Sequence, residues 1–256
     1  TDMLMGLEDM LVSCIGGGLC LAVCHGDGGT KGEAYVTRGK IALLENLAKH
    51  MINDPAAVND KLNRCLLCGS CAAACPSGVK IMDIFLRARS IVTGYMGLSP
   101  VKKLIFRSLL VRPKLFNTLL DLSGKFQGLF LKDASKVVGT SCAPLFKAFI
   151  GDRHFPSLAK TSFHTKTPSL DTPAGKSGLR VAFFPGCVSD KLFPNVAEAT
   201  VKVMEKHGVG IFMPGNQSCC GIPALASGDR QSYDKLVRQN LALFGDGNYD
   251  YLITPC

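Results

Sequence analysis

The sequence predicts an α+β protein in three parts: a helical, cysteine-rich domain, a basic helical connector, and an α/β domain with a parallel sheet. Three observations predict this organisation. Seven of the 12 cysteines lie in residues 1–93, in two closely spaced runs. Residues 94–178 contain the excess of positive charge, and residues 179–256 alternate strand and helix patterns. The chain has 256 residues, 47% of them hydrophobic, so it can bury a core and wholesale disorder is not expected.

The distribution of the cysteines also indicates a cellular compartment. A secreted protein stapled by disulfides would be shorter and would spread its cysteines along the chain. Bunched cysteines in a chain of this size indicate metal ligands in a reducing compartment, so we expect a cytoplasmic protein. The sequence has no run of 18 or more apolar residues that would predict a membrane-spanning helix. The chain starts at Thr1 and stops at Cys256 within a strand-to-loop pattern, so we expect a fragment of a longer protein.

In the first part, the second cysteine run is complete. Its members follow the spacing Cys-x2-Cys-x2-Cys-x3-Cys-Pro: Cys65, Cys68, Cys71, Cys75 and Pro76. This spacing is typical of [4Fe–4S] sites in two-cluster ferredoxins, because three thiolates on one tight loop can bind three iron corners of a cube. Paired cysteines also bind zinc, but this pattern is far more specific for a cluster. Residues 1–93 are therefore predicted to form a ferredoxin-like iron–sulfur domain.

The first cysteine run lacks one member. Cys14, Cys20 and Cys24 fit the same spacing, but Gly17 stands at the second position. In two-cluster ferredoxins the fourth cysteine of each run binds the other cluster.

This crossing predicts two ligand sets. Centre II has four thiolates, from Cys24, Cys65, Cys68 and Cys71, and suits a [4Fe–4S] cluster. Centre I has three, from Cys14, Cys20 and Cys75. Three thiolates suit a [3Fe–4S] cluster, or a [4Fe–4S] cluster with a non-protein ligand; a degraded, empty site is the alternative. His25 replaces the usual proline after Cys24 and is expected to be a packing residue.

The middle part, residues 94–178, is predicted to be a basic helical connector. Between Pro100 and Lys166 there are 12 basic and three acidic residues, so this segment alone carries the net charge of +9. Its apolar residues recur at helical spacing. A basic amphipathic helix can lie on an anionic membrane or against an acidic partner, and a solvated connector is the alternative. Nucleic acid is not expected as a partner, because the basic residues do not alternate with stacking aromatic residues. Residues 161–178 are rich in Ser, Thr, Pro and Gly and mark a domain boundary.

The third part, residues 179–256, reads as βαβαβ. Strands are predicted at 180–184, 209–213 and 249–254, and helices at 194–207 and 229–244. This order favours a parallel sheet with right-handed crossovers. Each cysteine here follows the carboxyl end of a strand, the edge at which open α/β sheets bind ligands: Cys187, Cys219, Cys220 and Cys256. Soft thiolates gathered at one edge favour an iron–sulfur or a zinc site.

Taken together, these motifs resemble the iron–sulfur subunits of bacterial glycolate and lactate oxidases, a Cys-Cys-Gly domain family. This family is related to the third subunit of anaerobic glycerol-3-phosphate dehydrogenase and to heterodisulfide reductase subunits. The resemblance rests on both cysteine runs and on four further motifs: Arg38-Gly39-Lys40, Phe184-Pro185-Gly186-Cys187, Cys219-Cys220-Gly221 and Thr254-Pro255-Cys256. It departs from the family at Gly17 and His25, and in lacking the second Cys-Cys-Gly half that usually follows.

The resemblance implies an electron-transfer subunit that is inactive alone. A partner flavoprotein containing FAD would oxidise a 2-hydroxy acid, glycolate or lactate, and electrons would pass through the clusters to a quinone or another acceptor. The chain itself has no complete G-x-G-x-x-G fingerprint for a flavin or nicotinamide. Two alternatives remain open: a heterodisulfide-reductase-like subunit that reduces a disulfide at a Cys-Cys-Gly cluster, and a non-catalytic assembly protein with one cluster. The expected location is cytoplasmic, with peripheral binding to the inner face of the cell membrane as an option.

Overall fold

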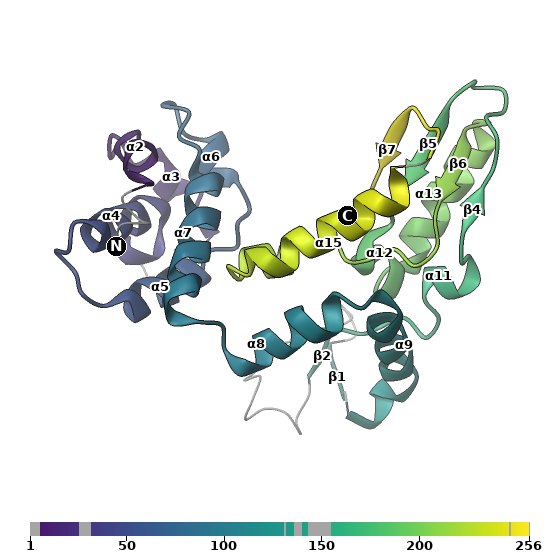
Figure 1. The fold of residues 1–256 in the computed structure, drawn as a ribbon, viewed down its shortest axis with the longest axis horizontal. Coiled ribbons are helices and arrows are strands. Elements are labelled where there is room, and N and C mark those ends of the chain that lie inside the picture. Colours follow the sequence, from purple (N-terminus) through teal and green to yellow (C-terminus); the bar gives the residue numbers. More distant parts are fainter. Residues whose placement is uncertain are drawn as a thin grey trace. The chain divides into compact units, whose positions relative to one another are not determined.

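The structure is a computed structural model that describes residues 6–25, 32–130, 132–135, 140–142, 155–245 and 247–255 (Figure 1). The chain divides into two compact units. Unit 1 comprises Thr1–Lys103 and Gly221–Tyr233, and unit 2 comprises Leu104–Cys220 and Asp234–Cys256. Segments that are distant in sequence are therefore brought into the same unit.

Unit 1 is helical in its described part. Its helices are α2 (Glu8–Val12), α3 (Leu19–Ala22), α4 (Thr37–Ala48), α5 (Pro55–Asn63), α6 (Ser70–Ala73), α7 (Ile81–Met96) and α14 (Ile222–Ala226), with a 3-10 turn at Glu33–Tyr35. Asp54 begins α5 by accepting a hydrogen bond from the amide of Ala57, and Pro55 occupies the first helical position. The apolar faces of α4, α5 and α7 form one core around Leu44, Leu62 and Phe85, and cysteines of both runs pack against it.

Unit 2 contains a four-stranded sheet in the order β4-β6-β5-β7. Strands β5 (Arg180–Phe183), β6 (Gly210–Met213) and β7 (Tyr251–Ile253) are parallel, with Val181 opposite both Ile211 and Tyr251. The parallel arrangement predicted for these strands is confirmed. An additional edge strand, β4 (Leu170–Asp171), pairs antiparallel with β6 and lies in the segment predicted as a boundary loop. The sheet as a whole is therefore mixed.

Helices cover this sheet as the apolar patterns predict. α13 (Pro194–Lys206) and α15 (Arg230–Phe244) occupy the two predicted helical stretches, and the short helices α11 (Phe163–Lys166) and α12 (Gly186–Lys191) were not predicted. Ala197, Val201 and Met204 of α13 are buried against the sheet residues Ile211 and Met213. Only Phe184 and Pro185 separate the end of β5 from the start of α12, so α12 places Cys187 at the carboxyl edge of the sheet.

The connector is helical over much of its described length. It contains α8 (Pro100–Leu104), a π-helix (Ile105–Leu110) and α9 (Pro113–Phe130). A small antiparallel sheet that the sequence did not predict follows, with strands β1 (Lys132–Ser135), β2 (Thr140–Cys142) and β3 (Phe155–Pro156). Over the described residues, no helix has both the length and the apolar character required to cross a membrane.

Candidate metal centres

The two cysteine runs fold into the same loop. At corresponding positions, Gly16 and Leu67 have φ values of 74° and 55°, and Gly18 and Gly69 have φ values of 102° and 79°. Each loop leads directly into a one-turn helix, α3 or α6. A left-handed conformation costs a residue with a side chain about 1–2 kcal/mol, yet Leu67 adopts it. The first run therefore keeps the loop shape of the complete run, although Gly17 replaces a cysteine.

The structure brings together the three cysteines predicted for centre I. Cys14 and Cys20 of the first run and Cys75 of the second run line one cavity of about 220 Å³. Gly17 lines the same cavity, at the position where the complete run has a cysteine. The cavity is several times larger than the roughly 30 Å³ that one water molecule occupies. A set of soft thiolates around a cavity of this size fits an inorganic cluster.

Arg38 places a positive charge beside centre I and holds the loop of the first cysteine run by a hydrogen bond. Its Nη1 donates to the carbonyl oxygen of Gly16 at 3.1 Å, and its Nε and Nη2 donate to the two carboxylate oxygens of Glu33 at 2.6 and 3.1 Å. Glu33 raises the pKa of Arg38 most, and the sulfurs of Cys20 and Cys14 add to that effect. The guanidinium therefore remains charged beside the cavity.

The Cys20 thiol of centre I differs from a free thiol in solution. Burial raises the pKa of Cys20, the backbone amide of Arg38 lowers it, and the neighbouring sulfurs of Cys14 and Cys71 raise it. The net direction is upward, first because burial disfavours the ionised thiol and further because neighbouring ionised sulfurs repel it. A bound cation or cluster would remove that repulsion.

The cysteines of centre II also influence one another. Burial raises the pKa of Cys71, and the sulfurs of Cys65 and Cys24 raise it further, although a hydrogen bond with Thr37 opposes them. The amide of Leu67 donates to the Cys65 sulfur at 3.5 Å. Such amide–sulfur bonds favour a negatively charged sulfur centre.

Cys68 is the exposed member of centre II. Hydrogen bonds with Ser70, from its hydroxyl and its backbone, and then with His25, lower the pKa of Cys68 to about 7. The Sγ of Cys68 lies 3.5 Å from the Oγ of Ser70. His25, which was predicted to be a packing residue, is exposed, and it contacts the Cys68 side chain.

The described C-terminal cysteines lie together at the edge of the unit 2 sheet. Cys187 and Cys219 line one small cavity of about 20 Å³. A hydrogen bond with Cys219 lowers the pKa of Cys187, while burial and the Cys220 sulfur act in the opposite direction. Cys256, the fourth predicted member, lies outside the described residues.

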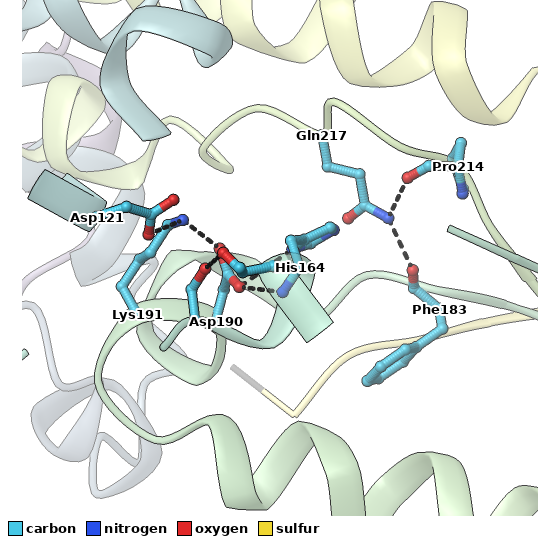
Figure 2. A network of polar contacts seen from close by, with 9 residues as sticks. Asp121, His164, Phe183, Asp190, Lys191, Pro214 and Gln217 are labelled. Atoms are coloured by element: carbon cyan, nitrogen blue, oxygen red, sulfur yellow. Dashed lines mark hydrogen bonds and ion pairs between the residues drawn. The ribbon is translucent and has the colours of Figure 1, made fainter. Parts of the chain in front are cut away.

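A polar network that the sequence did not reveal borders this cavity (Figure 2). His164 donates from its backbone amide to Asp190 Oδ1 at 2.8 Å, and its Nδ1 lies 3.2 Å from the same oxygen. Lys191, which is 4% exposed, binds Asp190 at 3.1 Å and Asp121 at 3.0 Å. Burial raises the pKa of Asp190, but the hydrogen bonds from His164 and the charge of Lys191 bring it below its ordinary value. These residues are dispersed in sequence and match no motif, so no sequence signal identified them.

Two atoms of this network lack a partner among the described residues. They are Nε2 of His164 and Oε1 of Gln217, and both residues line the cavity with Cys187 and Cys219. The Gln217 side chain is fixed, because its Nε2 donates to the carbonyl oxygens of Phe183 and Pro214 at 3.1 Å each (Figure 2). A cavity of about 20 Å³ holds one water-sized atom. Unpartnered polar atoms beside two thiols fit a polar or inorganic group at this site.

Within the described part of the chain, no three His, Cys, Asp or Glu side chains are placed to hold a single metal ion. A cluster requires a wider arrangement, because each cysteine binds its own iron atom. Around centre I, Cys14, Cys20 and Cys75 share one cavity, which is compatible with such a wider arrangement.

Comparison with known proteins adds independent findings. Residues 13–80 match the family of 4Fe-4S dicluster domains, and residues 181–256 match the family of cysteine-rich domains. The chain is 30% identical over 253 residues to the probable glycolate oxidase iron–sulfur subunit of Bacillus subtilis, covering 96% of this chain and 57% of that protein. It is 25% identical over 219 residues to the glycolate oxidase iron–sulfur subunit of Escherichia coli, covering 84% of this chain and 47% of that protein.

A shorter similarity involves about a third of the chain. Lactate utilization protein A of Shouchella clausii is 36% identical over 77 residues, which is 30% of this chain and 31% of that protein. The chain thus spans about half the length of the two glycolate oxidase subunits that it matches. No solved structure matches it.

Proposed function

We propose that this homologue of glycolate oxidase iron–sulfur subunits and of lactate utilization protein A is the electron-transfer subunit of an oxidoreductase complex. Its 4Fe-4S dicluster domain and its cysteine-rich domain support an iron–sulfur role. One observation supports the assignment most strongly: one cavity is lined by Cys14 and Cys20 of the first run and by Cys75 of the second. If the fourth cysteine of each run binds the other cluster, as predicted, centre I requires this set of cysteines.

We propose the ligand sets that the crossing of the two cysteine runs predicts, and the cavity supports the set of centre I. Centre II would hold a [4Fe–4S] cluster through Cys24, Cys65, Cys68 and Cys71. Centre I would hold a second cluster through Cys14, Cys20 and Cys75, with three thiolates favouring the [3Fe–4S] type. The retained loop shape at Gly16 and Gly18 supports a filled centre I over a degraded site.

When bound, a cluster supplies one-electron chemistry, and the protein supplies binding and electrostatics. The cysteine thiolates bind iron, the Leu67 amide donates toward the Cys65 sulfur, and Arg38 places a positive charge beside centre I. Cys71 is 7% exposed, so the inner side of centre II is shielded from water. These features favour a stable, negatively charged centre in a partly dry site.

The C-terminal cysteines are proposed to hold a third centre, of iron–sulfur or zinc type, through Cys187, Cys219, Cys220 and Cys256. Under the alternative hypothesis of a heterodisulfide-reductase-like subunit, this centre would react with a disulfide substrate and reduce it to thiols. An assembly protein with one cluster would leave centre I and the C-terminal cysteines without iron. Iron content per chain therefore separates the assembly reading from the other two.

The names of the glycolate oxidase relatives as iron–sulfur subunits support a partner catalytic subunit. We assign to that partner an FAD cofactor and the oxidation of a 2-hydroxy acid, glycolate or lactate. Reduced flavin holds two electrons, and the clusters would pass them on one at a time toward a quinone or another acceptor.

Stopped-flow spectroscopy of the reconstituted complex tests this function. The cluster absorbance should bleach when glycolate or lactate is added with the flavoprotein present, and should not bleach when the iron–sulfur chain is alone. Bleaching by a dithiol substrate, with none by any 2-hydroxy acid, would favour the disulfide-reductase reading instead.

Peripheral binding to the anionic inner face of the cell membrane is proposed from α9. Its exposed apolar residues recur every three or four positions along one stripe: Leu115, Leu119, Leu122 and Phe126. The opposite face is anchored, because Gln127 exchanges hydrogen bonds of 2.7 and 2.9 Å with the backbone of Leu158. Exposed Lys114 and Lys125 lie beside the stripe and suit anionic lipid.

A further inference from the structure

Arg89 is a buried arginine at which three segments of unit 1 meet. It lies in α7 and is 4% exposed. Its Nη2 donates to the carbonyl oxygen of Cys65 at 2.7 Å and also to that of Leu62, in the last turn of α5. Its Nη1 donates to the carbonyl oxygen of Ala226, the last residue of α14, at 2.7 Å. One guanidinium thus joins the start of the second cysteine run to α5 and α14.

These acceptors are all neutral carbonyl groups. Burial lowers the pKa of Arg89, and across the described residues the Cys65 sulfur is the only titratable group that raises it. The Nε of Arg89 has no hydrogen-bond partner within the same described part of the chain. The partial negative charge at the end of α5 offsets some of the cost of burying this cation. A buried cation with no other counter-charge is strongly unfavourable, so a further negative group is expected beside Cys65.

We propose that Arg89 is the buried counter-cation of centre II and raises the reduction potential of the cluster held there. The inference rests on the proposed function, because it requires that Cys65 binds a cluster. The step concerned is the transfer of one electron to the cluster, from reduced flavin in the complex or from dithionite in a titration. The cluster gains one negative charge in this step, and a fixed positive charge nearby favours the reduced form. Arg89 does not touch iron in this proposal; its hydrogen bond to the Cys65 carbonyl oxygen places the charge beside the centre, and the charge acts through space.

The same side chain links centre II to α14. Thr93, one turn further along α7, donates from Oγ1 to the carbonyl oxygen of Ser227 at 3.1 Å. Gly228, with φ of 83°, packs so closely on the backbone of Arg89 and the side chain of Thr93 that a Cβ atom would collide with both. The turn after α14 is therefore fixed on α7. Because α14 begins directly after Gly221, Arg89 connects the Cys65 loop with the segment that follows the Cys-Cys-Gly motif.

A redox titration of the loaded protein, followed by EPR at the centre II signal, tests the charge. Arg89→Gln removes the charge and keeps a hydrogen-bonding side chain, whereas Arg89→Lys keeps the charge and loses the forked geometry. Arg87→Gln is the matched control, since Arg87 is exposed on the same helix.

At a fixed ambient potential, Arg89→Gln should lower the ratio of reduced to oxidised cluster about tenfold, a shift of about 59 mV to lower potential for a one-electron couple. Arg89→Lys should remain within about twofold of the wild type, and so should the control. Amide hydrogen exchange over residues 222–226 should become faster in Arg89→Gln and remain slow in the control.

An unchanged reduction potential in Arg89→Gln would overturn the proposal. Because lysine retains the charge, a shift of the potential in Arg89→Lys as large as that in Arg89→Gln would also overturn it. Loss of iron from both variants would do the same. If only Arg89→Gln fails to load iron, the Arg89→Lys variant tests the proposal, which requires that the cluster in this variant keeps the wild-type reduction potential. Wild-type protein without iron at Cys65 would contradict the proposed function itself, and iron analysis distinguishes that failure from a failure of the Arg89 role.

Discussion

The guanidinium of Arg38 donates a 3.1 Å hydrogen bond to the carbonyl oxygen of Gly16, in the loop that lacks a cysteine. The same nitrogen is the nearest atom to the position a Cβ would occupy at Gly18, at 3.0 Å. Arg38 therefore braces both left-handed glycines of the first loop. This relationship explains how the loop keeps its shape with only three thiolates around it.

Restoring the missing cysteine should convert centre I. Gly17→Cys is sterically permitted, because a Cβ there meets nothing within 4 Å and the backbone does not have a positive φ. The variant should bind about one more iron atom per chain and replace a [3Fe–4S] EPR signal by a [4Fe–4S] signal. Gly17→Ala is the control for the side chain alone. Equal iron content in all three proteins would exclude a [3Fe–4S] cluster at centre I that Gly17→Cys converts.

Removing one thiolate of centre II should unfold much of the ferredoxin-like domain, residues 1–93. Cys68→Ser lies on the exposed side of the centre, so its effect reports ligand loss more than altered packing. Metal-binding free energy in such a loop-rich segment is folding free energy, and a loss of about 2 kcal/mol lowers Tm by roughly 8–16 °C. Iron analysis and circular dichroism melting measure both effects. Ser70→Ala, which retains the thiol, is the control; unchanged iron and Tm in Cys68→Ser would contradict the assignment.

Removing the Arg38 side chain should empty centre I selectively. Arg38→Met loses the brace at Gly16 and the charge beside the cavity, so iron at centre I should fall while centre II keeps its signal. The exposed ion pair with Glu33 contributes little to global stability. Lys49→Met, which breaks the exposed pair with Glu45, is the control and should have a similar Tm. Equal loss of iron from both centres would show that Arg38 supports the whole domain.

Asp190 should contribute stability that disappears in acid. Its pKa is below the ordinary value of 3.8 in the folded protein, so its contribution is complete above pH 3.8 and is lost as the pH falls through the folded pKa. Asp190→Asn should cost about 1–3 kcal/mol of unfolding free energy near neutral pH, because His164 and Lys191 lose a charged partner. The difference from wild type should shrink below pH 3.8.

Urea denaturation followed by circular dichroism across this pH range measures that difference. Asp171→Asn is the control, since the Asp171 side chain is 73% exposed and its pair with Arg180 is open to solvent. A penalty for Asp190→Asn that stays constant through the acid range would contradict the ionised pair.

Membrane binding through α9 should depend on charge and on salt. Reversing two exposed charges, Lys114→Glu with Lys125→Glu, should abolish flotation with anionic vesicles. Added salt should weaken binding of the wild type, because screening shortens to about 8 Å near physiological ionic strength. Lys202→Glu with Lys206→Glu, two exposed positions on α13, is the control for net charge. Equal binding of the wild type to neutral and anionic vesicles would remove the electrostatic argument.

The cysteine spacing by itself predicted much of the candidate site. Ligand spacing is local, because three thiolates within one tight loop are constrained by a few backbone angles. The pairing of Cys75 with Cys14 and Cys20 was predicted from the ferredoxin pattern, and the structure places all three around one cavity. Periodicity likewise predicted α13, α15 and the parallel strands, since each has an apolar face that must be buried.

Only the tertiary structure decided the features that join distant segments. The edge strand β4 exists because Thr172 and its neighbours meet β6 in space, and two residues are too few to leave a pattern. The sequence does not distinguish Arg89 from other polar residues of α7, and only the structure shows its three carbonyl partners. Likewise, only the contact with Asp190 identifies His164 as a residue of the candidate site. Local spacing determines which residues can bind metal. The charges and hydrogen bonds that surround the candidate sites come from long-range packing, which a linear pattern does not record.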